Sequence, residues 1–153
     1  MIFFDQSEVK IELFEDRTLE SIAHEKAGTR WVIIRKISAE MRIGTSAPIT
    51  RITDLYKVKA TLRYFSNAYW RRRDSHGHIP EKYRHREQVI AGPYTIILET
   101  GHYRGNPEFR FTCVPQREGF PKREINLDII AVTAVEDALG RVLGKITQDS
   151  SLF

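Results

Sequence analysis

The sequence predicts an α+β domain in which two helices cover one face of a mainly antiparallel sheet. Three segments alternate apolar and polar residues with the period of a strand, at residues 8–16, 56–65 and 123–131. A pattern with helical spacing follows the last of them. At 153 residues, 41% of them hydrophobic, the chain is long enough to bury one substantial core. We therefore expect a single domain over residues 1–153.

The first half of the chain predicts two strands and a short helix. Residues 8–16 alternate as a half-buried strand does. Residues 17–28 have apolar side chains at helical spacing after Asp16, a suitable N-cap, so we expect a helix there, with a hairpin as the alternative. The β-branched run at 30–37 predicts the next strand, and residues 43–50 contain Gly and Pro and predict a loop.

Residues 56–65 alternate more regularly than any other segment and predict the central strand. The apolar face of this strand would carry Tyr56, Val58, Ala60, Leu62 and Tyr64. The opposite face would carry Lys57, Lys59, Thr61 and Arg63. A strand with one apolar and one basic face has the core on one side only. Residues 66–88 would then form a long basic loop after this strand.

The second half predicts a hairpin and a final helix. Residues 94–103 and 108–114 flank the sequence RGNP, which is typical of a turn between two strands. Residues 123–131 alternate as another strand. Thr133 and Glu136 form a capping box that would open the last helix. The apolar side of that helix would carry Val135, Leu139, Val142, Leu143 and Ile146.

The positive charge of the chain is concentrated in its middle. Residues 51–124 carry 15 Lys or Arg against 8 Asp or Glu, a net charge of +7, whereas the whole chain has a net charge of +4. Such an asymmetry favours an anionic partner.

Cysteine content and hydropathy indicate where the protein resides. The single cysteine, Cys113, has no second cysteine to pair with inside the chain, and it alternates with Phe109 and Phe111 as a buried, unreactive thiol would. The apolar runs are far shorter than a membrane span, and the first residues lack a signal-peptide pattern. We expect a cytoplasmic protein that does not cross a membrane.

These features predict a nucleic-acid-binding domain without enzymatic activity, with RNA or single-stranded DNA as its partner. Lysine and arginine would contact phosphates, and aromatic rings would stack on unpaired bases. The predicted contact residues are Lys57, Lys59, Arg63, Tyr69, Trp70, Arg71, Arg72, Arg73, Lys82, Arg84, Arg86, Arg104 and Arg110. The simpler interpretation is a hydrated strand face followed by a mobile charged loop.

Two further hypotheses belong to other classes of protein. A small nuclease or phosphodiesterase would use His76, His78 and His85 as general acid, general base or metal ligands. Cationic residues crowd these histidines and would repel a divalent ion, so we expect no metal, and no motif calls for a cofactor. A third hypothesis is an oligomeric interaction or assembly protein whose basic loop contacts a partner.

Overall fold

The computed structural model has the predicted α+β fold. It describes residues 2–6, 9–15, 37–44, 47–71, 86–103 and 106–150. The strands are β1 (Ile2–Gln6), β2 (Val9–Glu15), β3 (Ile37–Ile43), β4 (Pro48–Ile49), β5 (Arg86–Ala91), β6 (Tyr94–Tyr103), β7 (Asn106–Pro115) and β8 (Arg123–Leu127). The helices are α2 (Ile52–Arg71) and α3 (Ile129–Ser150).

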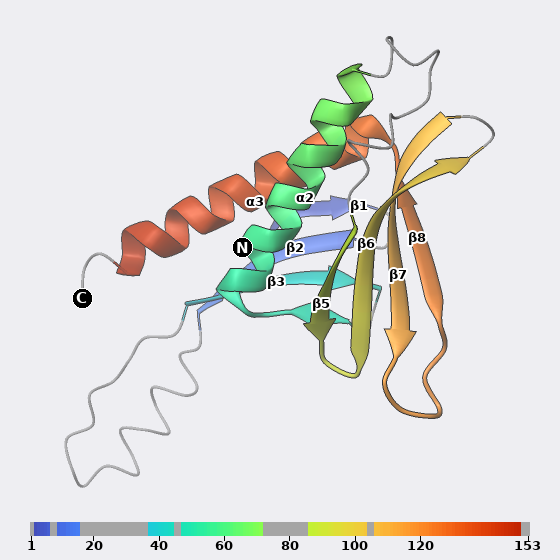
Figure 1. The fold of residues 1–153 in the computed structure, drawn as a ribbon. Helices are drawn as coiled ribbons and strands as arrows, with labels where there is room; N and C mark the ends of the chain where they lie inside the picture. Colours follow the sequence, from blue (N-terminus) through green and yellow to red (C-terminus); the bar gives the residue numbers. More distant parts are fainter. Residues whose placement is uncertain are drawn as a thin grey trace, which may run out of the picture.

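The strands form two antiparallel sheets of four strands each, rather than the one sheet that the sequence predicted. In both sheets, β1–β4 and β5–β8, the spatial order of the strands follows the order in the chain. The strands of the two sheets run in clearly different directions, and the sheets come into contact at β4 and β5 (Figure 1). Among the described elements, four strands followed by one helix therefore occur twice.

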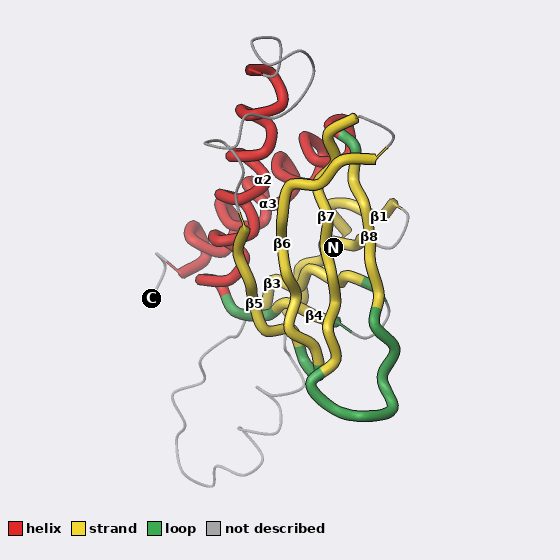
Figure 2. Tube along the Cα trace, turned by 45° about the vertical axis from the view of Figure 1, so that its right-hand side comes forward, coloured by secondary structure: helices red, strands yellow, loops and turns green. Residues whose placement is uncertain are grey.

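Each helix packs mainly on the sheet built by the other half of the chain. Helix α2 follows β4 but contacts β5, β6 and β7, whereas α3 follows β8 and makes its largest sheet contacts with β1, β2 and β3. The two helices also contact each other, and they lie together on one side of the strands (Figure 2). Buried side chains from both sheets and both helices form one hydrophobic cluster. This exchange of helices joins the two halves around a common core.

The strand predicted at residues 8–16 and the hairpin predicted after residue 94 are confirmed. In β2 the alternating side chains of Val9 and Ile11 are buried. Strands β6 and β7 pair from Tyr94 to Tyr103, and the pairing leaves only two residues between Tyr103 and Asn106. Another tight turn joins β5 to β6 through Gly92, whose φ of 59° lies in the region that glycine adopts without steric cost.

The central strand predicted at residues 56–65 is wrong, because these residues lie inside helix α2. The buried side chains of the helix are Leu55, Val58, Thr61, Leu62, Phe65 and Ala68, which follow helical spacing. Tyr56 and Tyr64 had suggested a period of two because both were counted as core residues. These two residues are 50% and 46% exposed, so they belong to the outer side of the helix.

Helix α3 is confirmed, but it begins earlier than the capping box predicted. Its N-cap is Asp128, whose Oδ1 accepts a hydrogen bond from the backbone N–H of Ala131 at 2.8 Å. The Thr133 hydroxyl donates instead to the carbonyl of Ile129 at 2.8 Å, inside the first turns. The strand predicted at 123–131 therefore ends at Leu127. All five predicted apolar residues of α3 are buried.

Three short strands had no clear signal in the sequence, namely β1, β4 and β5. The residues of β4 were predicted as loop, yet Ile49 pairs with Met41 of β3. The helix predicted at 17–28 lies outside the described residues. The same is true of the strand predicted at 30–37 except for its last residue, Ile37, which begins β3.

Candidate nucleic-acid interface

Helix α2 presents alternating aromatic and cationic side chains on its outer side. The exposed members of this aromatic–cationic stripe are Tyr56, Lys57, Arg63, Tyr64, Trp70 and Arg71. They recur at intervals of one, six or seven residues, which keeps them on one side of an α-helix over about 22 Å of its length. The stripe exists because the opposite side of α2 supplies its apolar residues to the core.

The stripe contains no acidic side chain. The one carboxylate of α2 belongs to Asp54, which lies in the first turn and is half-buried. Arg63 is exposed and forms no ion pair or hydrogen bond with any residue that the structure describes. An anion approaching α2 from outside would therefore meet positive charge and aromatic rings without a competing carboxylate on the helix itself.

A chain of ring contacts connects the most exposed aromatic residue of the described part of the chain to the core. Trp70 is 64% exposed, and its ring lies edge to face with Tyr69 at a centroid distance of 5.2 Å. Tyr69 in turn contacts Phe65 at 6.4 Å, and Phe65 packs on Phe109 of β7 at 5.6 Å. Edge-to-face and tilted ring pairs are favourable and orient the rings. Trp70 is consequently exposed while its neighbour Tyr69 connects it to buried rings.

Lys57, Lys59 and Arg63 were predicted to project together from one strand face, but on α2 they point in different directions. Lys57 lies at the edge of the stripe, where its Nζ is 3.9 Å from Oε2 of Glu87 on β5. Lys59 points toward α3, with its Nζ 3.8 Å from Oε1 of Glu136. Only Lys57 and Arg63 thus share the outer side, because a helix turns by about 100° per residue whereas a strand alternates. The Lys57 pair is the more exposed of the two, and exposed ion pairs contribute little stability.

Arg86 and Arg110 lie on the outer face of the second sheet, away from the stripe. Phe109 and Phe111 on either side of Arg110 are buried, so Arg110 points outward, and Arg86 lies on the side of β5 opposite the buried Val89 and Ala91. There Arg110 Nε is 3.3 Å from Glu124, and Arg86 Nε is 3.7 Å from Glu99. Both arginines therefore have carboxylate partners, and neither extends the stripe.

Several predicted site residues lie outside the described residues. They are Arg72, Arg73, His76, His78, Lys82, Arg84, His85 and Arg104. Within the parts of the chain that the structure does describe, no cluster of three or more His, Cys, Asp or Glu side chains could hold a metal ion. Cys113 is buried, as its alternation with Phe109 and Phe111 predicted.

The sequence prediction missed Tyr56 and Tyr64 as surface residues. The sequence also contains a helical signal, because Leu55, Val58 and Leu62 recur at intervals of three and four, but residues 56–65 fit a strand pattern as well. Among the described helices, none is long and apolar enough to span a membrane. Comparison of the chain with models of protein families, with curated proteins and with solved structures gave no match.

Proposed function

We propose that the protein binds RNA or single-stranded DNA through the aromatic–cationic stripe of α2. The observation that carries this proposal is the combination of three exposed rings with lysine and arginine side chains, and no carboxylate of the helix itself, on one side of α2. Lysine and arginine neutralise phosphates and release their counterions. Aromatic rings accept unpaired bases of any sequence, each stacked base contributing about 1 to 3 kcal/mol.

The aromatic rings favour a single strand over a duplex. A basic helix can enter the major groove of DNA, where arginine reads base edges. In a duplex, however, the faces of the bases already stack on one another, so the rings of Tyr56, Tyr64 and Trp70 would find no partner there. Residues 72–85 directly follow α2 in the chain and carry four Lys or Arg against two Asp or Glu, which adds positive charge next to the stripe in the sequence.

The test is binding to fluorescent single-stranded oligonucleotides over a range of salt concentrations. We expect the logarithm of the affinity to fall linearly with the logarithm of the salt concentration, by about 0.7 for each neutralised phosphate. Arg63→Glu should weaken binding and reduce this slope. Trp70→Ala should weaken binding by about 1 to 3 kcal/mol while leaving the slope nearly unchanged.

An abasic oligonucleotide of the same length separates stacking from charge. The wild-type protein should bind it more weakly than the normal oligonucleotide, whereas Trp70→Ala should bind both equally. Matched controls come from the exposed connection between β7 and β8, which lies at the opposite end of the molecule from the C-terminal end of α2 (Figure 1). There Arg117→Glu repeats the charge change and Phe120→Ala repeats the loss of an exposed ring.

Three results would count against the proposal. The wild type could fail to bind either polymer in low salt, the two control variants could weaken binding as much as the stripe variants, or duplex DNA could bind as tightly as a single strand. If the partner is instead an acidic protein, the wild type should bind neither nucleic acid in low salt, and Arg63→Glu should lose binding to that acidic protein.

A further inference from the structure

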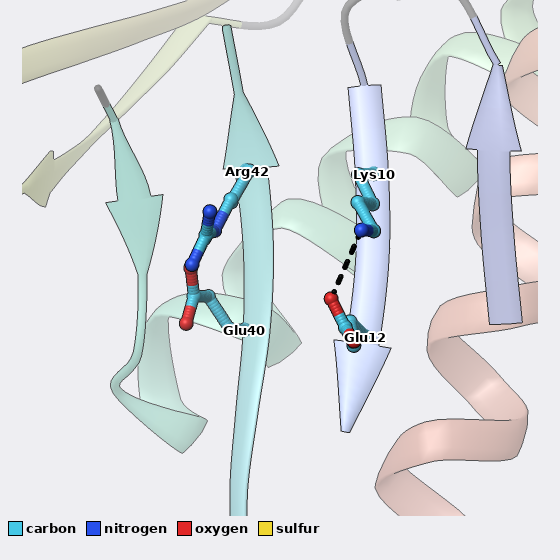
Figure 3. A network of polar contacts seen from close by, with 4 residues as sticks. All are labelled: Lys10, Glu12, Glu40 and Arg42. Atoms are coloured by element: carbon cyan, nitrogen blue, oxygen red, sulfur yellow. Dashed lines mark hydrogen bonds and ion pairs between the residues drawn. The ribbon is translucent and has the colours of Figure 1, made fainter. Parts of the chain in front are cut away.

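The outer face of the first sheet carries its charges in two rows of opposite sign. Lys10 of β2 lies directly opposite Arg42 of β3, and two residues further along Glu12 lies opposite Glu40. The four side chains project on the side of β2 and β3 away from the two helices (Figure 3). On the inner side, their neighbours Val9, Ile11, Met41 and Ile43 are buried.

On β2 and β3, opposite charges pair along each strand and not between the two strands. Lys10 Nζ lies 3.2 Å from Glu12 Oε2, and Arg42 forms a hydrogen-bonded ion pair with Glu40. The hydrogen bond to Glu40, followed by its negative charge, raises the pKa of Arg42 above its ordinary value. Across the strands, like charges face each other, an arrangement that disfavours strand pairing. The face therefore has a fully charged positive row beside a negative row.

We infer that this face of β1, β2 and β3 binds a second copy of the same chain. A twofold axis parallel to the rows and midway between them places each positive row over the negative row of the other copy. Lys10 then lies over Glu12 of the second copy, and Arg42 lies over Glu40 of the second copy. Sheets that pack face to face are about 10 Å apart, a distance that these long side chains can bridge together.

Strand β1 at the edge of the sheet is compatible with the same arrangement. Asp5 is exposed at the end of the positive row, opposite Lys10, and Ile2 is exposed at the end of the negative row, opposite Glu12. The twofold axis places Asp5 over Ile2 of the second copy, so no two carboxylates meet. A twofold axis along the strands would instead place each row over itself, and repulsion excludes that orientation.

The area of the face indicates a weak dimer. Strands β2 and β3 have seven residues and are about 23 Å long, β1 has five, and the three strands side by side span roughly 15 to 20 Å. Two such faces would bury on the order of 700 to 900 Å² in total, which is below the range of stable complexes. We expect a dissociation constant in the micromolar range, since interfaces of about 1,600 Å² already range from μM to pM. It should rise with salt, because ions screen exposed charges over about 10 Å at 0.1 M.

Two variants with complementary faces test the inference. Lys10→Glu with Arg42→Glu makes both rows negative, and Glu12→Lys with Glu40→Lys makes both rows positive. In sedimentation equilibrium of nuclease-treated protein at low salt, the wild type should dimerise and each double variant alone should be monomeric. An equimolar mixture of the two should dimerise again, because every row then faces the opposite charge.

A fourfold variant that exchanges the two rows should fold and dimerise like the wild type, and Arg63→Glu on α2 should leave dimerisation unchanged. The inference is overturned if the wild type is monomeric at about 1 mM, well above the expected dissociation constant. It is also overturned if either double variant dimerises alone, or if the row-exchanged variant has a native circular dichroism spectrum but stays monomeric. None of these results bears on nucleic-acid binding, so the two proposals fail separately.

Discussion

Two glycines in α3 allow the effect of the contact between α2 and α3 on the free energy of unfolding to be measured. Gly140 lies where α3 faces α2, and a Cβ atom placed on it would be 3.2 Å from Cε of Lys59. A Cβ atom on Gly144, four residues later, would have no atom within 4 Å beyond the adjacent backbone of α3, among the residues that the structure describes. A Gly→Ala substitution would therefore meet the Lys59 side chain at residue 140 and would meet no such neighbour at residue 144.

Replacement of glycine by alanine inside a helix adds about 1 kcal/mol of stability, because the unfolded chain loses conformational freedom. Gly144→Ala should gain this full amount, which corresponds to a rise in Tm of about 2 to 4 °C for a chain of this size. At Gly140 the flexible end of Lys59 must move by a few tenths of an ångström. This movement disturbs the partly exposed ion pair with Glu136, whose N···O distance of 3.8 Å is long and whose worth is about 0 to 1 kcal/mol. Gly140→Ala should gain correspondingly less.

Urea unfolding followed by circular dichroism gives both free energies. In a Lys59→Ala background the obstacle is absent, so Gly140→Ala should there recover the gain seen at Gly144. Equal gains at both positions in the wild-type background would show that Lys59 does not constrain Gly140. A loss of stability at Gly144 would show that this part of α3 packs against another surface.

Two further outcomes follow from single side chains. Asp128→Ala should lower the free energy of unfolding by about 0.5 to 2 kcal/mol, because the N-cap bond to Ala131 is lost. Asp128→Asn should retain most of that stability, and an equal loss in both variants would contradict a capping role. Cys113 should react with a thiol reagent only as fast as the protein unfolds, because its side chain is buried in the core. Rapid modification of the folded protein would place the thiol at the surface.

The candidate site was partly predictable from the sequence. Tyr69, Trp70 and the arginines around them stand out by composition alone, and the excess of positive charge in residues 51–124 needs no structure. The side to which each residue points could not be predicted, because strand and helix distribute the same residues differently. Lys59 was expected beside Arg63 on one basic face, yet it lies against Glu136 of α3.

The sequence by itself determined the elements whose pattern is compatible with only one structure. Strand β2 alternates without exception in its described side chains, β6 and β7 flank a strong turn signal, and α3 has apolar residues at helical spacing over several turns. In each of these elements the secondary structure that the local sequence prefers is also the one that buries its apolar side chains. No information from distant residues is therefore needed to predict it.

Only the tertiary structure decided whether residues 56–65 are strand or helix. Tyrosine has an apolar ring and a polar hydroxyl, so Tyr56 and Tyr64 are compatible with either side of the element. The helix is selected because it buries Leu55, Val58, Leu62 and Phe65 together against β5–β7 and α3. Strand β4 likewise exists because Met41 and Arg42 offer it a pairing edge. Two residues have no strand signal of their own, and the neighbouring strand supplies the hydrogen bonds that define them.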